Sequence, residues 1–255
     1  MEAALLPSQG DLWQQTLGWQ PSPAQQQQLQ RLYGGIVAGN RQLNLTRLTE
    51  PQDFWEKHLW DSLRALRPWL RDGAALGKPG QGAAVAGAAV VDIGSGGGFP
   101  GIPAAIALPQ AQVTLMDSTR KKMVFLQQLV AQLGLTNVET VTERAEAAGQ
   151  QARHRNHYDL ALIRAVGPVT VCAEYCLPMV KYGGTAVLYR GQWTVEEAEA
   201  LEEAAKLLGA ELVEVDAFET PLSRGTRHCL YLRKIAGTPD LFPRPVGVPA
   251  QDPLP

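Results

Sequence analysis

Long hydrophobic runs are absent from the 255-residue sequence, and no apolar stretch approaches the roughly 20 residues that a membrane-spanning helix needs. The N-terminal residues MEAALLPSQGDLW lack the basic start and the apolar core of a signal peptide. Cysteine is also scarce: Cys172, Cys176 and Cys229 are too few for a disulfide framework and include no CxxC pair that would suggest zinc. We therefore expect a cytoplasmic protein with no membrane span, no bound metal and ordinary buried thiols.

A strong net charge is missing as well, since 23 basic residues nearly balance 25 acidic residues and leave a formal charge of −2. This balance gives no global sign of nucleic-acid binding, so any such contact must depend on local patches. The charges are separated along the chain: residues 190–219 are strongly acidic, whereas residues 220–255 are mildly basic. The basic side chains of this last stretch are Arg224, Arg227, Arg233, Lys234 and Arg244.

Sequence patterns divide the chain into four parts, at residues 1–72, 73–88, 89–236 and 237–255. The first part is predicted to be an N-terminal helical cap, with one helix that begins after Ser22 and a second that runs from Pro51 to Leu70. Residues 73–88 are rich in glycine and alanine and are interpreted as a linker or an insertion. The proline-rich tail at 237–255 is expected to be extended or disordered.

Residues 89–236 alternate between strand and helix patterns, which is typical of a doubly wound α/β sheet. The candidate strands are 89–93, 112–117, 137–141, 158–164, 184–190, 211–217 and 227–234. Little helix separates the last two strands, so we expect them to form an antiparallel pair at one edge of the sheet.

The first strand runs into a glycine-rich loop, VVDIGSGGGFPG at residues 90–101. A dinucleotide-binding loop of the type GxGxxG would place its third glycine where this sequence has Phe99. The series from Asp92 to Gly94 and Gly96 instead resembles motif I of methyltransferases that use S-adenosylmethionine (SAM). The ammonium and sulfonium groups of SAM favour nearby carboxylates and a closely approaching backbone. A tight strand-to-helix turn without a ligand is the alternative.

The second strand ends at Asp117, 23 residues after Gly94. A carboxylate at this end of a parallel strand can accept hydrogen bonds from both hydroxyls of a ribose. Ser118 and Thr119 start the next helix and are expected to line the same pocket. The simpler alternative is that Asp117 only caps that helix.

The third and fourth strands point further residues at the same edge of the sheet. Ala145 and Glu146 follow the third strand, at the loop that usually borders the adenine of the cofactor, and Arg164 ends the fourth strand. Four loops therefore converge on one edge, which indicates a ligand pocket more strongly than any single motif does.

Taken together, the motifs resemble those of the 16S ribosomal RNA guanine-N7 methyltransferases, the family also called glucose-inhibited division protein B. The similar segments are NLT at 44–46, HLWDSL at 58–63, DIGSGGGFPGIP at 92–103, DSTRKKMVFL at 117–126, RAE at 144–146, IRAV at 163–166 and RHCLYLRK at 227–234. The resemblance covers nearly the whole chain. One departure is that Pro245 and Val246 stand where basic residues are frequent in the family.

The resemblance implies a seven-stranded, doubly wound, Rossmann-like α/β sheet of the SAM-methyltransferase type with an N-terminal helical cap. It also implies methylation of guanosine 527, in the 530 loop of 16S rRNA, with 16S rRNA or the small ribosomal subunit as the partner; we expect a monomer. The implied SAM contacts are Gly94, Gly96, Phe99, Asp117, Ser118, Thr119, Ala145, Glu146 and Arg164.

The residues around the fourth strand give evidence about the target atom that does not depend on the family resemblance. The sequence Ile-Arg-Ala-Val replaces the (Asp/Asn)-Pro-Pro-aromatic motif that orients exocyclic amines, and Cys172 and Cys176 lie too far along to attack a pyrimidine carbon. Guanine N7 needs no general base, because its lone pair is already available. A methyltransferase acting on a small molecule or a protein, and a nonenzymatic SAM-binding regulator, are the alternative functions.

No catalytic residue can be assigned from the sequence, although Arg164 and His58 are candidates. Arg164 could donate to guanine O6, support the SAM pocket or form a structural salt bridge. His58 and Asp61 lie three residues apart and share one flank of the predicted helix, so they could close over the cofactor or tie the cap to the sheet. Asn44 has the same two possible roles, and its simpler role is that of a turn residue.

Overall fold

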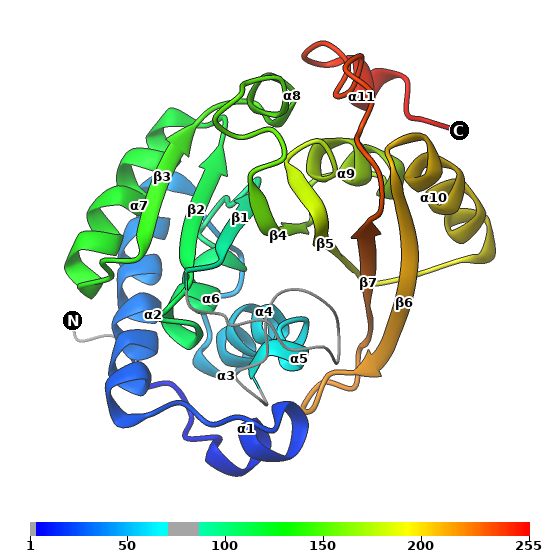
Figure 1. Ribbon diagram of the computed structural model, residues 1–255. Coiled ribbons are helices and arrows are strands. Elements are labelled where there is room, and N and C mark those ends of the chain that lie inside the picture. The colour runs from blue at the N-terminus through cyan, green and yellow to red at the C-terminus, as the bar shows by residue number, and fades with distance from the viewer. Residues whose placement is uncertain (1–3, 71–86) are drawn as a thin grey trace.

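A computed structural model describes residues 4–70 and 87–255, so the linker expected at 73–88 lies outside the described residues except for its last two positions. The core is a seven-stranded sheet in the order β3-β2-β1-β4-β5-β7-β6 (Figure 1). The strands are β1 (Ala89–Ile93), β2 (Gln112–Asp117), β3 (Val138–Thr142), β4 (Tyr158–Arg164), β5 (Val180–Arg190), β6 (Ala210–Glu219) and β7 (Thr226–Lys234). This confirms the predicted α/β sheet.

The pairing of the strands follows their burial. Strands β3, β2, β1, β4 and β5 are parallel, and the central strands β1 and β4 are almost continuously buried, as expected for strands covered on both faces. The expected antiparallel pair is confirmed: β6 forms the outer edge, and β7 lies between β6 and β5. The exposed glutamates of β6, Glu211, Glu214 and Glu219, suit an edge strand that must not pair with another chain.

Helices cover both faces of the sheet because successive strand residues point to opposite sides. Val90 packs with α6 (Gly101–Ala107) and α7 (Arg120–Leu133) on one face, in a cluster that also includes the N-terminal helices. Val91 packs on the other face with α9 (Val169–Cys176) and α10 (Val195–Leu207). The short helix α8 (Ala145–Gly149) follows β3.

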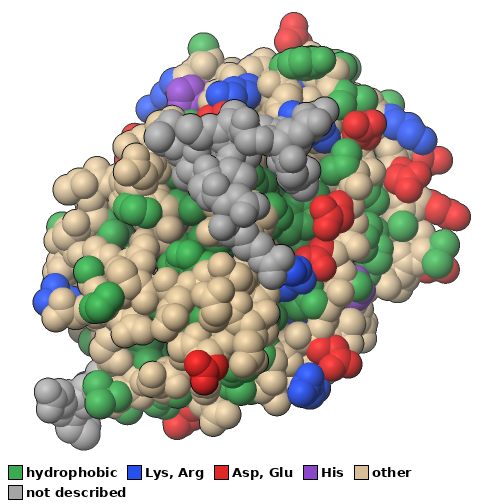
Figure 2. Space-filling view, turned by 60° about the horizontal axis from the view of Figure 1, so that its bottom comes forward, with side chains coloured by type: hydrophobic (Ala, Val, Ile, Leu, Met, Phe, Trp, Pro, Cys, Tyr) green, Lys and Arg blue, Asp and Glu red, His purple; other side chains and the backbone are tan. Residues whose placement is uncertain are grey.

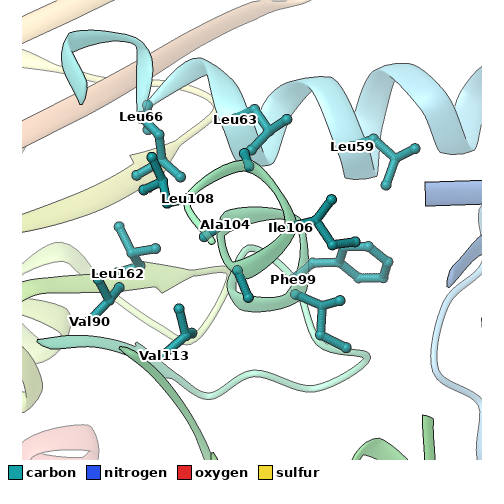
Figure 3. Close-up of a cluster of buried hydrophobic side chains, with 14 of the residues drawn as sticks. Leu59, Leu63, Leu66, Val90, Phe99, Ala104, Ile106, Leu108, Val113 and Leu162 are labelled. Carbon is teal, nitrogen blue, oxygen red and sulfur yellow. The ribbon is translucent and has the colours of Figure 1, made fainter. Parts of the chain in front are cut away.

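The N-terminal helices pack on α6, and they also contact strands in the other half of the sheet: the Tyr189 hydroxyl of β5 donates to the Ser62 carbonyl, and the Tyr231 hydroxyl of β7 donates to the Ala65 carbonyl. Figure 3 shows Leu59, Leu63 and Leu66 facing α6, whose own side chains lie over strand residues such as Val113. The cap contains α1 (Gly10–Leu17), α2 (Pro23–Leu43), α3 (Pro51–Phe54), η1 (Trp55–Trp60), α4 (Asp61–Arg64) and α5 (Arg67–Leu70). Within residues 4–70 and 87–255, no helix is both long enough and apolar enough to cross a membrane.

Two expectations about the cap have different outcomes. The predicted helix start at Ser22 is confirmed, because its hydroxyl accepts from the Gln25 amide and the Gln25 side chain accepts from the Ser22 amide. The helix predicted from Pro51 to Leu70 is helical over residues 51–64 and 67–70, but it is not one continuous α-helix. The wider π-helical turn η1 interrupts it, and a break at Ala65 and Leu66 precedes Pro68, which has no N–H to continue the helical bonding.

The proline-rich tail is ordered and packs on the sheet domain, so the expectation of an extended or disordered tail is wrong. It contains a short helix, α11 (Val248–Gln251), which lies near α8 and α9 at the top of Figure 1. The physical reason is a buried ion pair: the Arg244 guanidinium contacts the Glu174 carboxylate at 2.7 Å, and Glu174 is fully buried in α9. A buried carboxylate needs such a partner, and the tail supplies it.

Candidate active site

A cavity of about 580 Å³ opens where β1, β2, β3 and β4 end. Its walls are the glycine loop after β1, the end of β2, the loop between β3 and α8, and the loop after β4. The cap contributes Leu45 and His58, α9 contributes Val171 and Tyr175, and the tail contributes Ala250. The cavity has the size of a small-molecule pocket and lies at the carboxyl ends of parallel strands, the usual ligand position in such sheets.

The glycine loop turns through backbone conformations that other residues rarely adopt. Gly94, Gly96 and Gly98 have φ values of 71°, 56° and 91°. Space is restricted too, since a Cβ atom on Gly98 would lie 2.6 Å from the Ile102 Cδ1 atom. The amides of Gly94 and Ser95 both donate to the Met116 carbonyl, which fixes the loop to β2. The loop therefore presents its backbone, rather than side chains, to the cavity.

Asp92 supports this loop from behind instead of lining the cavity. Its side chain is completely buried, and its Oδ2 atom accepts from the Gly101 amide at 2.9 Å, at the start of α6. Burial raises the pKa of this carboxyl group from 3.8 to about 7. A Cβ atom on Gly101 would lie 2.7 Å from the same Oδ2 atom, so the glycine allows the close contact. The sequence pattern placed Asp92 correctly beside the loop, but the carboxylate faces α6.

Asp117 lies in the cavity wall and also holds the backbone at the start of the next helix. It lines the cavity, and its Oδ2 atom accepts from the Gly96 amide at 2.9 Å while its Oδ1 atom accepts from the Thr119 amide at 2.8 Å. The carboxylate thus joins the glycine loop to the start of α7. Ser118 also lines the cavity, whereas Thr119 does not: it is the N-cap residue of α7, and its carbonyl accepts the first helical hydrogen bonds.

Ala145 and Glu146 both line the cavity, but the Glu146 carboxylate is already occupied by protein groups. Its oxygens accept from Arg144 at 2.8 Å, from the Tyr175 hydroxyl at 3.3 Å and from the Gly247 amide at 3.0 Å. Burial raises the pKa of Glu146, but hydrogen bonds from Arg144 and Gly247 outweigh it, and the net pKa is lowered. Glu146 is therefore an anion that holds α8, α9 and the tail together.

Arg164 connects the sheet edge to the cap across the cavity. Its Nη1 atom donates to the Asp61 carboxylate and to the Lys57 carbonyl, each at 2.9 Å, and its Nη2 atom lies 3.3 Å from Nδ1 of His58. The π-helical turn η1 places Lys57 and His58, while Asp61 begins α4. The salt-bridge role expected as one alternative for Arg164 is thus present, and the side chain still lines the cavity.

His58 is neutral, with both ring nitrogens engaged. Burial, and then the charge of Arg164, lower its pKa from 6.5 to about 3. Because an arginine can only donate, Nδ1 of His58 accepts, so the proton resides on Nε2, which lies 2.6 Å from the Thr46 hydroxyl. The ring also stacks on Phe99, with centroids 4.5 Å apart. His58 therefore positions Phe99 and Arg164 and is a poor general base.

Sequence reasoning missed several cavity residues. Leu45 lines the cavity and belongs to the NLT segment, in which only Asn44 was considered. Asn44 is the C-cap residue of α2 with φ 49°, the turn role expected as its alternative. Lys122 lies in the first turn of α7, and its position in the DSTRKK segment could have indicated it. Tyr175 and Ala250 carry no local signal, because only the packing of α9 and the tail brings them to the cavity.

Other chemistries find little support in the part of the chain that is described. No group of three or more histidine, cysteine, aspartate or glutamate side chains is placed to hold a metal ion among these residues. All three cysteines are buried and unpaired. Burial raises the pKa of the Cys172 thiol to about 11, so at neutral pH it is not the thiolate that a cysteine nucleophile requires.

Known proteins share both the sequence and the fold. A family profile described as GidB, rRNA small subunit methyltransferase G, matches residues 25–229. A ribosomal RNA small subunit methyltransferase G from Nostoc punctiforme is 54% identical over 250 residues, covering 98% of this chain and 99% of that protein. The protein of the same name from Synechococcus elongatus is 57% identical over 242 residues, covering 95% of each chain.

Solved structures resemble the fold at low sequence identity. A 16S rRNA (adenine(1408)-N(1))-methyltransferase from Catenulisporales acidiphilia has a TM-score of 0.51 at 18% identity, covering 60% of this chain and 87% of that chain. A branched-chain polyamine synthase from Thermus thermophilus also reaches 0.51, at 13% identity, covering 69% of this chain and 56% of that chain. These likenesses show the fold alone, whereas the family match and the relatives span most of the chain. The chain therefore belongs to the rRNA small subunit methyltransferase G family of enzymes.

Proposed function

We propose that this enzyme transfers the methyl group of SAM to N7 of a guanosine in 16S rRNA, at position 527 in the 530 loop. The observation that carries the proposal is the convergence of four sheet-edge loops on one cavity with the Asp117 carboxylate in its wall. Family membership supports rRNA as the class of substrate. The atom and the position of methylation rest on the family resemblance and on the chemistry of the cavity.

Asp117 is suited to hold the ribose of SAM. A carboxylate offers about four lone-pair positions, and the Gly96 and Thr119 amides use two of them. The remaining positions can accept from the two ribose hydroxyls without breaking either backbone hydrogen bond. In this placement Gly94 and Gly96 approach the methionine part of SAM, and Ala145, in the next loop along the sheet, borders the adenine.

The proposed reaction is a direct displacement that needs no proton transfer. The lone pair of guanine N7 forms the new N–CH₃ bond while the S–CH₃ bond breaks, so the positive charge moves from sulfur to the purine ring and a neutral thioether leaves. The cavity suits this step, because His58 is a poor base and Cys172 is a protonated thiol. What the enzyme must supply is alignment and exclusion of water.

Arg164 is the candidate donor to the target base. A guanidinium carries five N–H donors, and three of them are assigned to Lys57, Asp61 and His58. Two donors therefore remain on a side chain that lines the cavity, and one of them could bind guanine O6. Because Asp61 and the neighbouring carbonyl hold the guanidinium in place, this donor would be positioned before RNA binds.

Electrostatic attraction to RNA is modest. In Figure 2, acidic side chains gather on the right-hand side, where β6 and α10 lie in Figure 1. Two of the basic residues near the C-terminus are not free to contact RNA. Lys234 is buried and donates to the Leu177 carbonyl, and Arg244 is paired with Glu174. Arg224 remains exposed. We infer few phosphate contacts and recognition of rRNA shape.

The class of substrate is tested with methyl-labelled SAM and three acceptors: small ribosomal subunits that lack the modification, bare 16S rRNA, and free guanosine. We expect transfer to the subunits or the bare rRNA and none to guanosine, because shape recognition needs folded RNA. Labelling of guanosine alone would contradict the proposal and favour a small-molecule methyltransferase. SAM binding without transfer to any acceptor would favour a regulatory protein.

A further inference from the structure

The ordered C-terminal tail reaches the cavity itself. Ala250, in α11, lines the cavity together with the loops at the sheet edge. Three residues earlier, the Gly247 amide donates to Oε1 of Glu146, another cavity-lining residue, at 3.0 Å. The tail is therefore in contact with the cavity wall, although it is more than 100 positions further along the chain than Glu146.

Separate contacts anchor the tail away from the cavity. Arg244 makes several hydrogen bonds of 2.7–3.1 Å to the carboxylate of Glu174. Arg155, which follows α8, donates to the carbonyls of Thr238 and Phe242 at 2.9 and 2.7 Å. None of these residues lines the cavity. The anchor up to Arg244 can therefore be kept while the part that touches the cavity is changed.

The tail touches a specific end of the cavity. Glu146 and Ala145 begin α8, directly after the loop that follows β3. The cap residues Leu45 and His58 instead line the side formed by Phe99 and Arg164. In the proposed placement of SAM, the loop after β3 borders the adenine. The tail contact at Glu146 and Ala250 thus lies at the adenine end.

We propose that residues 247–250 of the tail form the outer wall of the adenine end of the SAM site and that their docking raises the affinity for SAM. The inference rests on the proposed function, because it takes the cavity to be the SAM site. Binding linkage is reciprocal, so bound SAM in turn holds the tail in its docked position. The tail is then a cofactor-binding element as well as a packed end of the fold.

The first test compares two tryptophan substitutions on the same short helix. Ala250→Trp places a large ring in the cavity wall, whereas Gln251→Trp, the matched control, alters an exposed neighbour that does not line the cavity. We expect Ala250→Trp to weaken SAM binding by at least about tenfold in calorimetry, since the ring fills space the adenine needs. Gln251→Trp should bind like the wild type, and both variants should melt at wild-type temperature.

The second test removes the wall without filling it. A chain ending at Pro245 keeps the Arg244 anchor but loses Gly247 and α11. We expect SAM to bind about three- to tenfold more weakly, because the hydrogen bond from Gly247 to Glu146 is lost and α11 no longer covers the adenine end. In the intact chain, SAM should slow hydrogen exchange at the Gly247 amide. Wild-type affinity in both Ala250→Trp and the shortened chain would overturn this inference and leave the SAM site standing. A wild-type chain that bound no SAM would overturn the proposed function itself.

Discussion

Replacement of Asp117 by alanine tests the proposed cofactor placement most sharply. The change removes an acceptor for the Gly96 and Thr119 amides in the free protein and for the two ribose hydroxyls in the complex. Hydrogen bonds to a charged acceptor contribute about 1.5–3 kcal/mol, so SAM affinity should fall by about 10- to 150-fold. Because ribose binding is remote from the breaking S–CH₃ bond, the turnover of saturated enzyme should change much less.

The assay must separate lost binding from a disturbed loop. Asp159→Ala is a matched control. The Asp159 carboxylate also accepts a hydrogen bond from a backbone amide, that of Ala89 at 2.9 Å, but Asp159 does not line the cavity. Both variants should lose about 0.5–1.5 kcal/mol in the free energy of unfolding, the usual net contribution of a hydrogen bond. Only Asp117→Ala should lose SAM affinity in calorimetry. Wild-type affinity in a folded Asp117→Ala variant would reduce Asp117 to a helix cap and refute the placement.

Three further predictions follow from the cavity and the loop that forms it. Gly94→Val should abolish SAM binding in calorimetry. It should also lower the melting temperature, because φ is 71° and a Cβ atom would lie 2.6 Å from Val166 Cγ2; a variant with wild-type stability would contradict this. The raised pKa of Asp92 contributes stability below pH 3.8, on the order of 4 kcal/mol, that is lost as the pH rises to about 7. Asp92→Asn should therefore flatten the decline of the unfolding free energy between about pH 4 and 7 in urea titrations. An unchanged pH profile in that variant would count against a buried neutral Asp92. With the pKa of His58 near 3, the single-turnover rate should vary little between about pH 6.5 and 8.5, and a step near pH 6.5 that His58→Asn removes would contradict the neutral histidine.

The sequence predicted the sheet and the glycine loop well, because both have strong local signals. Strand β1 runs directly into glycines that must adopt positive φ, and Asp117 ends the next strand, so the chain order itself places them at one edge. The sequence also named Arg164 and His58, and the structure places both in the cavity wall. Their contact with each other could not be derived, because it depends on how the cap docks across the sheet edge.

The errors have a common physical cause, which is that local composition does not report distant partners. The proline-rich tail looked disordered, but Arg244 satisfies a carboxylate buried in α9, 70 positions earlier in the chain. Lys234 looked like a candidate for RNA contact, but its side chain is buried in the protein and donates to the Leu177 carbonyl. The π-helical turn that places His58 leaves no mark in the spacing of apolar residues, which suited a single α-helix.

Mass spectrometry of the modified nucleoside, mapped to its position in 16S rRNA, tests the central claim most directly. Small subunits from cells that lack the gene should be treated with the purified enzyme and SAM, and with Asp117→Ala at a limiting SAM concentration as the matched control. The account predicts 7-methylguanosine at position 527 with the wild-type enzyme and little with the variant. A methyl group on N1, N2 or the ribose, or on a different nucleotide, would contradict it.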